Sequence, residues 1–179
     1  MAIDRYSKDY RLIDSVDGRG RIHTETEYIG AYYAFAGDIA AARRAGRQLA
    51  LLCAVGWLSF LAALYPQSRC ARALWAVLPC AFTAVPLWQL TSVAVTALRV
   101  REPFVRRDAE RFSLRLPSAA LFTALLTGLA LLGGGLYLLL SRAGALPGDW
   151  VFLGGNGLCL VCALLSRRLR PPLETRTVS

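Results

Sequence analysis

Residues 116–141, LPSAALFTALLTGLALLGGGLYLLLS, form an uncharged run of 26 residues between Arg115 and Arg142. A helix crosses the hydrocarbon of a bilayer with about 20 mostly apolar residues, in a range of about 17–25. The run is therefore long enough to span a membrane once.

Three further runs of the same kind lie in the chain. Arg47 and Arg69 enclose 21 uncharged residues, Arg72 and Arg99 enclose 26, and Asp149 and Arg167 enclose 17. Only 18% of the residues are charged, against nearly a quarter in soluble domains. A chain of 179 residues is too short to bury four such helices in a soluble core.

The sequence thus predicts an all-α membrane protein, an antiparallel four-transmembrane-helix bundle. The connections 67–72 and 142–149 are very short, which predicts tight helical hairpins. The expected transmembrane domain covers 38–166, with spans at about 48–65, 73–98, 117–141 and 150–166.

Basic residues are strongly asymmetric about these spans. Of 21 Lys and Arg residues, eight precede the first span, six lie at 99–115 and four in the tail 167–179, which leaves three for the other side. By the positive-inside rule, both termini and the middle loop are cytoplasmic. Arg outnumbers Lys twenty to one, which suggests a GC-rich bacterial genome and hence the bacterial inner (plasma) membrane.

The net charge of +9 fits attraction to anionic lipid head groups. No basic patch interleaved with aromatic residues indicates nucleic-acid binding. Candidate contacts to head groups or to a partner lie in the middle loop: Arg99, Arg101, Arg106, Arg107 and Arg111. This loop is expected to form an amphipathic helix on the inner leaflet, to bind acidic residues of the N-terminal segment, or both.

The N-terminal segment 1–37 contains two alternating runs around the turn Asp17-Gly18-Arg19-Gly20, which predicts a small cytoplasmic β-hairpin. Because a lone hairpin is marginally stable, it needs a surface to lie on; the alternative is a disordered polar tail. The aromatic stretch 28–35 is too short to span and is expected at the head-group level. Asp38 is the expected N-cap of the helix that follows.

The predicted spans contain no Asp, Glu, Lys, Arg or His, which disfavours a proton relay or a proton-coupled antiporter. Pro79 and Pro86 are expected to bend the second span. The residues that remain as candidates for a solute pathway or for helix packing are Gln89, Thr91, Ser92, Thr96, Gly133, Gly134 and Asn156.

Cys159 and Cys162 form a C-x-x-C of the kind found in four-helix membrane oxidoreductases that pass electrons from thiols to quinone. Such proteins need a second cysteine pair in an outer segment, where this chain offers Cys70 alone. Packing is the favoured role for these thiols. His23 near Glu25 and Glu27 is a weak metal-ligand pattern, and we expect no metal site, no cofactor and no catalytic centre.

The leading hypothesis is a non-enzymatic small membrane protein, an accessory subunit or homo-oligomer that acts through helix packing and a cytoplasmic docking surface. Its expected partners are the lipid bilayer and either a second copy or another membrane protein, with no nucleic acid. Two alternatives stay open: a channel or transporter for a neutral or weakly hydrated solute, and a thiol–quinone oxidoreductase that uses Cys159 and Cys162.

Overall fold

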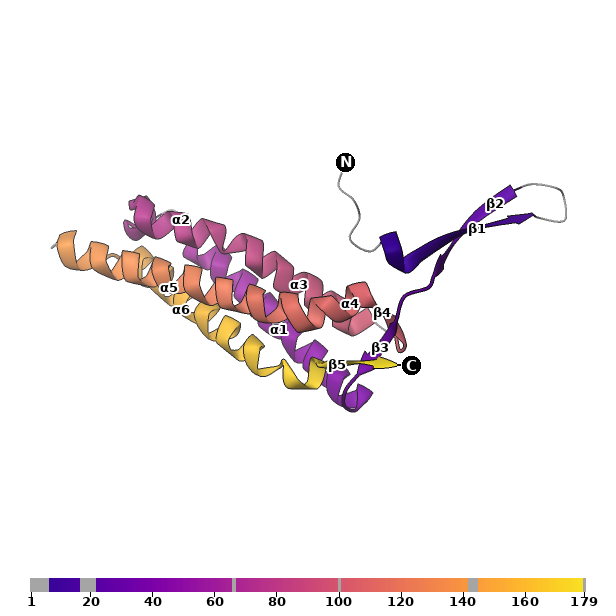
Figure 1. The fold of residues 1–179 in the computed structure, drawn as a ribbon. Coiled ribbons are helices and arrows are strands. Elements are labelled where there is room, and N and C mark those ends of the chain that lie inside the picture. Colours follow the sequence, from indigo (N-terminus) through magenta and orange to yellow (C-terminus); the bar gives the residue numbers. More distant parts are fainter. Residues whose placement is uncertain (1–6, 17–21, 66, 100, 142–144, 179) are drawn as a thin grey trace.

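Four helices, each long and apolar enough to cross a membrane, run side by side in an antiparallel bundle (Figure 1). The computed structural model describes residues 7–16, 22–65, 67–99, 101–141 and 145–178. The helices are α1 (Ile39–Ala63), α2 (Leu74–Phe82) continued by α3 (Ala84–Arg99), α4 (Arg106–Glu110) continued through the π-helical turn Arg111–Arg115 into α5 (Leu116–Ser141), and α6 (Pro147–Arg168). The prediction of four helices long and apolar enough to cross a membrane is confirmed, and these helices are consistent with a multi-pass membrane protein.

Two spans are longer than the uncharged runs that predict them. Helix α1 begins at Ile39, because the carboxylate of Asp38 caps it by accepting the Ala40 amide at 3.1 Å. The third span begins at Arg106, so part of the expected amphipathic loop is helical and continuous with the span. Helical turns that contain charged residues thus extend the apolar helices beyond the ends of the charge-free runs.

The second span is interrupted at Thr83, between its two prolines. Helix α2 contains Pro79, and Pro86 lies in the first turn of α3, where it has no amide to donate to a carbonyl one turn earlier. The Thr83 hydroxyl donates to the Pro79 carbonyl at 2.9 Å, and the Leu87 amide donates to the Thr83 carbonyl at 3.1 Å. The expected bend therefore takes the form of a short break.

Small side chains occupy much of the bundle interior, and many of the large apolar ones lie on its outer surface. Helix α1 packs between α3 and α6, while α5 packs against α6, α2 and α3. Ala63, Ala76 and Ala120 are fully buried, whereas Leu132 is 73% and Leu139 80% exposed. In lipid there is no gain from hiding leucine, and small residues let helices approach closely, so this distribution is typical of a membrane-embedded bundle.

Two small sheets lie at one end of the bundle. Strands β1 (Tyr10–Val16) and β2 (Ile22–Tyr28) form the expected antiparallel hairpin, with Tyr10 opposite Tyr28 and Val16 opposite Ile22. The expected turn at 17–20 lies outside the described residues. In the second sheet, β3 (Tyr32–Phe35) lies between β4 (Phe104–Val105) and β5 (Thr175–Val178).

This three-stranded sheet was not foreseen in the sequence. It joins the segment before α1, the loop after α3 and the chain after α6, and so ties all four spans together at one end. Below it, the rings of Phe35, Phe104 and Phe112 pack with centroids 5.1–6.0 Å apart. The Phe35 amide donates to the Glu102 carboxylate at 2.7 Å. Whether the aromatic stretch lies at the head-group level stays a prediction.

Gly155→Ala should destabilise the bundle, because a Cβ there would stand 2.6 Å from the Ser59 carbonyl oxygen and 3.0 Å from the Ala63 Cβ. Overpacking of this kind costs about 1–3 kcal/mol. The measurement is the midpoint of thermal unfolding in detergent, followed with a thiol-reactive dye, since the cysteines are buried.

The matched control is Gly154→Ala, one residue earlier on α6, where a Cβ would meet nothing within 4 Å. Its midpoint should equal or slightly exceed that of the wild type, because Ala has the higher helix propensity. Equal midpoints for the two variants would contradict close packing of α6 against α1 at Gly155.

Candidate functional site

The two ends of the bundle differ in character. We call the end with both sheets and the segment 99–115 the strand end, and the end with the connections 64–73 and 145–149 the turn end. The candidate residues named from the sequence lie in two places. The arginines and the hairpin lie at the strand end, and the polar residues and cysteines lie within the helical bundle.

The β1–β2 hairpin extends away from the bundle as an arm (Figure 1). Its described side chains are largely exposed on both faces. Leu12 is 71% exposed and Ile13, which points to the opposite face, is 41% exposed. A two-stranded sheet with apolar side chains on two open faces is the most unusual exposed feature of the strand end.

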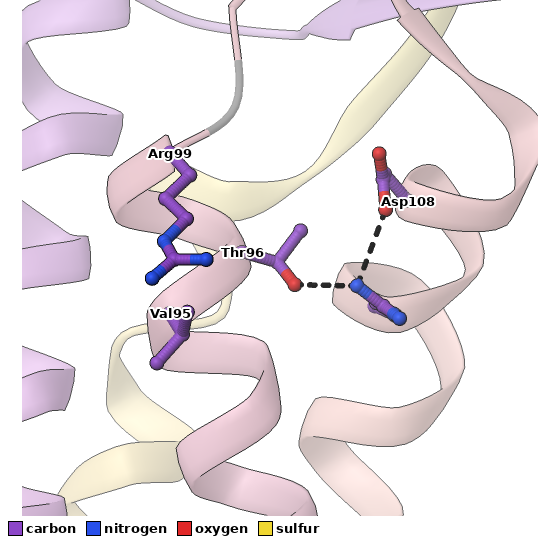
Figure 2. A pocket seen from close by; sticks show the side chains of 5 residues that line it. Val95, Thr96, Arg99 and Asp108 are labelled. Atoms are coloured by element: carbon purple, nitrogen blue, oxygen red, sulfur yellow. Dashed lines mark hydrogen bonds and ion pairs between the residues drawn. The ribbon is translucent and has the colours of Figure 1, made fainter.

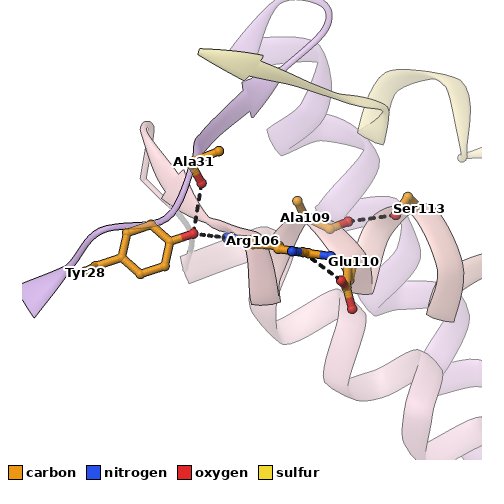
Figure 3. Close-up of polar contacts among 6 residues, drawn as sticks. All are labelled: Tyr28, Ala31, Arg106, Ala109, Glu110 and Ser113. Atoms are coloured by element: carbon orange, nitrogen blue, oxygen red, sulfur yellow. Dashed lines mark hydrogen bonds and ion pairs between the residues drawn. The ribbon is translucent and has the colours of Figure 1, made fainter. Parts of the chain in front are cut away.

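The base of the arm is fixed through Tyr28 (Figure 3). Its hydroxyl donates to the Ala31 carbonyl at 2.8 Å and accepts the Arg106 amide at 3.1 Å. Its ring lies edge-on to those of Tyr10 and Tyr32, with centroids 5.2 Å away in each case. Burial raises the pKa of the Tyr28 phenol above its ordinary value.

The arm thus contacts the arginine-rich loop through a tyrosine and a backbone amide. The expected contact through acidic side chains stays a prediction, because the side chains of Asp14, Asp17 and Glu25 lie outside the described part of the chain. Within the part of the chain that the structure describes, no ion pair joins the hairpin to the loop. The Arg106 side chain instead pairs with Glu110 at 3.2 Å on its own helix.

Four of the five arginines proposed as head-group or partner contacts are exposed, and Arg111 is partly buried. Arg99 and Arg111 line one pocket of about 260 Å³ together with Val95, Thr96 and Asp108 (Figure 2). This pocket lies where the last turn of α3 meets the π-helical turn that leads into α5.

The polar residues of the second span lie on separate faces of the bundle. Thr91 accepts the Trp57 indole N–H at 3.0 Å, and Thr96 accepts a guanidinium N–H of Arg111 at 2.7 Å. Ser92 supplies the carbonyl that accepts the Thr96 hydroxyl. Gln89 is exposed, in a surface groove that also contains Ser118. Thr96 and Gln89 thus line two different pockets, and a solute pathway along this span stays a prediction.

Asn156 faces the bundle interior, as expected, and is 2% exposed. Its amide donates to the Phe152 carbonyl at 2.9 Å, one turn earlier on α6. The bond is local to the helix, and packing accounts for the position of this side chain.

The glycines of α5 and α6 fall into two classes. Gly133 lies against the Trp75 carbonyl and Ala76, and Gly134 lies against Phe152 and Leu153, so both serve packing within one chain. At four others, an added Cβ would have nothing of this chain within 4 Å: Gly128, Gly135, Gly154 and Gly157. Those four leave small-residue surface open on the outside of the bundle.

All five cysteines are free and buried. Cys159 is 1% and Cys162 5% exposed, in the interior face of α6. Cys70, the outer thiol, is fully buried at the turn end, with its Sγ 3.6 Å from the Gly134 carbonyl oxygen. No metal-binding group of three or more His, Cys, Asp or Glu side chains occurs among the residues that the structure describes.

A buried carboxylate at the turn end is the polar centre that the sequence patterns did not predict. Asp149 is fully buried, and its Oδ1 accepts the Ser68 hydroxyl at 3.0 Å and the amides of Arg69 and Cys70 at 2.7 and 3.1 Å. Its Oδ2 accepts the Leu146 amide at 2.9 Å. The sequence feature that could have indicated it is an acidic residue at the third position of α6. From there a carboxylate can accept a backbone amide at the start of the helix.

Four hydrogen-bond donors occupy the two oxygens of this carboxylate, so its role is structural. It joins the turn between α1 and α2 to the start of α6. Burial and the neighbouring Asp149 charge raise the pKa of the Cys70 thiol to about 11. Cys70 is therefore held as an unreactive thiol.

No family model, curated protein or solved structure matches this chain. The candidate site is accordingly defined by its own geometry: the exposed arm, the sheet that supports it, and the pocket between Arg99 and Arg111.

Cys70 should be alkylated far more slowly than an exposed thiol in the same turn. With a pKa of about 11, its thiolate fraction near neutral pH is roughly 100-fold below that of an ordinary thiol. Its rate should go on rising with pH up to about 11, because deprotonation is what creates the nucleophile. Peptide mass spectrometry after timed alkylation measures the rate at this residue.

The control is Gln67→Cys, an exposed position three residues away, whose rate should level off near pH 9, the ordinary pKa of a thiol. Reaction of Cys70 at the rate of this introduced thiol would show that the turn end is open.

Proposed function

We propose that this protein is a non-enzymatic membrane subunit that anchors a partner through the exposed hairpin arm on the cytoplasmic side. The observation that carries the proposal is the arm itself, which extends from the bundle with apolar side chains on both faces and is fixed at its base by Tyr28. The partner is a second membrane protein or a second copy of this chain.

The shape of the arm supports a docking role. Two strands alone are marginally stable in water, and each edge offers unpaired backbone groups that another strand can bind. Leu12 and Ile13 supply apolar contacts to either face, as expected of a segment that completes its structure against a partner.

The outer surface of the bundle supports association within the membrane. Gly154 lies in an apolar groove between α1 and α6, bordered by Val55, Leu58 and Leu158. Helices associate in lipid through small residues at which backbones approach closely. The outward glycines of α5 and α6 thus suit a further helix, while Gly133 and Gly134 are occupied inside the chain.

Leu12→Ser combined with Ile13→Ser should weaken partner binding roughly tenfold or more, because exposed apolar anchors at the centre of an interface carry much of its energy. The measurement is native mass spectrometry of the protein released from its native membranes in a mild detergent. A stoichiometric second chain on the wild type should be lost from the double variant.

Lys8→Ser, at an exposed position before β1, is the control and should keep the partner. Equal retention by wild type and double variant would rule out the arm as the docking element. Thermal unfolding of the variants, compared in parallel, separates loss of the partner from loss of the fold.

The orientation is tested separately. If the strand end is cytoplasmic, as the excess of arginine indicates, Lys8→Cys and Arg176→Cys should resist a membrane-impermeant maleimide in intact cells and react after permeabilisation. Gln67→Cys, at the turn end, should react in intact cells. The native thiols are buried and give little background. The opposite labelling pattern would place the arm outside.

A further inference from the structure

The pocket lined by Arg99 and Arg111 carries more positive charge than its neighbours balance. Asp108 is the one acidic residue among the five that line it. Arg111 Nη1 donates to the Thr96 hydroxyl at 2.7 Å and lies 3.4 Å from the Asp108 carboxylate (Figure 2). The pocket is therefore lined by two guanidinium groups and one carboxylate, which pairs with Arg111 alone.

Hydrogen-bond donors are in excess as well. A guanidinium has five N–H donors and no acceptor. Within the described chain, Arg111 Nε is buried without a hydrogen-bond partner, and the Arg99 side chain makes no hydrogen bond or ion pair. Because an unsatisfied buried donor is costly, a bound acceptor that carries negative charge would stabilise this arrangement.

We propose that this pocket binds the phosphate group of an anionic glycerophospholipid. The phosphodiester has two non-bridging oxygens that share one negative charge, and Arg binds such oxygens through paired N–H donors. Arg99 lies on α3 and Arg111 on the π-helical turn before α5, so two different helical segments supply the basic lining of the pocket.

The position of the pocket identifies the lipid as the source of the phosphate. Arg99 is the last residue of α3, and Arg111 lies one helical turn before α5, so both stand where a span leaves the hydrocarbon. Val95, one turn deeper on α3, is 38% exposed and offers apolar contact below the phosphate. Basic pockets between transmembrane helices on the cytoplasmic side suit anionic head groups in this way.

The pocket is also pre-organised. Phe112 is 1% exposed in the aromatic cluster with Phe35 and Phe104, which fixes the backbone beside Arg111. The π-helical turn Arg111–Arg115 widens the helix at this point, and such turns often accompany functional sites. The Thr96 hydroxyl donates to the Ser92 carbonyl at 2.9 Å, which leaves its oxygen to hold Arg111.

The test is native mass spectrometry of the purified full chain with added phosphatidylglycerol or phosphatidylcholine. The wild type should retain phosphatidylglycerol and release phosphatidylcholine. Arg99→Gln and Arg111→Gln should each weaken phosphatidylglycerol binding about tenfold or more, the value of a hydrogen bond to a charged group. Arg99→Gln is the sharper variant, because this side chain has no bond to lose within the described chain, so its unfolding midpoint should not change.

The matched control is Arg107→Gln, an exposed arginine of α4 outside the pocket, which should bind lipid as the wild type does. Equal binding by Arg99→Gln and wild type would overturn the proposal, as would an equal loss in Arg107→Gln, which would indicate diffuse attraction. Displacement of the lipid by inorganic phosphate alone would overturn it in favour of a soluble anion. None of these outcomes depends on the docking arm.

Discussion

The carboxylate of Asp149 is the interaction on which the arrangement of the bundle depends most directly. Two helical hairpins can slide or splay in lipid, because no hydrophobic force draws one apolar helix towards another. Asp149 opposes this movement by binding the amides of Arg69 and Cys70 and the Ser68 hydroxyl, which lie on the other hairpin. A buried charge without these donors would cost several kcal/mol, so the turn end is stable only in its closed form.

The opposite end is joined by different means. There β3 lies between strands from the loop after α3 and the chain after α6, and the phenylalanine cluster packs beneath the sheet. Clamped at both ends, the helices meet along their length through many alanine, glycine and serine residues, with large buried side chains such as Leu49, Leu90 and Phe152 among them. Gly155 against the Ser59 carbonyl is the tightest of these contacts on α6. A rigid bundle of this kind gives the arm and the arginine pocket a fixed support.

The sequence predicts the parts of this fold that follow from local patterns. Charge-free runs predict the four spans, alternation predicts β1 and β2, and Asp38 predicts the start of α1. The second sheet escapes such patterns, since β4 has two residues and its partners lie far apart in the chain.

Local sequence patterns also fail to identify the arginine pocket and the role of Asp149. The five arginines proposed as contacts look equivalent in the sequence, yet in the described structure Arg99 and Arg111 line one pocket together. What separates them from the rest is a π-helical turn and the position of α3, which are properties of the folded chain. Asp149 marks the limit of an uncharged run in the sequence, and its role emerges only when two distant turns meet.

The contrast between the ends indicates where the protein meets other molecules. At the turn end the one buried charge has four donors, the neighbouring thiol is held in its neutral form, and no exposed arm is present among the described residues. At the strand end, within the part of the chain that the structure describes, a buried guanidinium nitrogen has no acceptor and no other element packs over the two-stranded sheet. Unsatisfied groups persist in a folded protein when a ligand or partner completes them. These open groups favour recognition at the strand end, where lipid phosphate and a partner strand would supply what the chain itself leaves open.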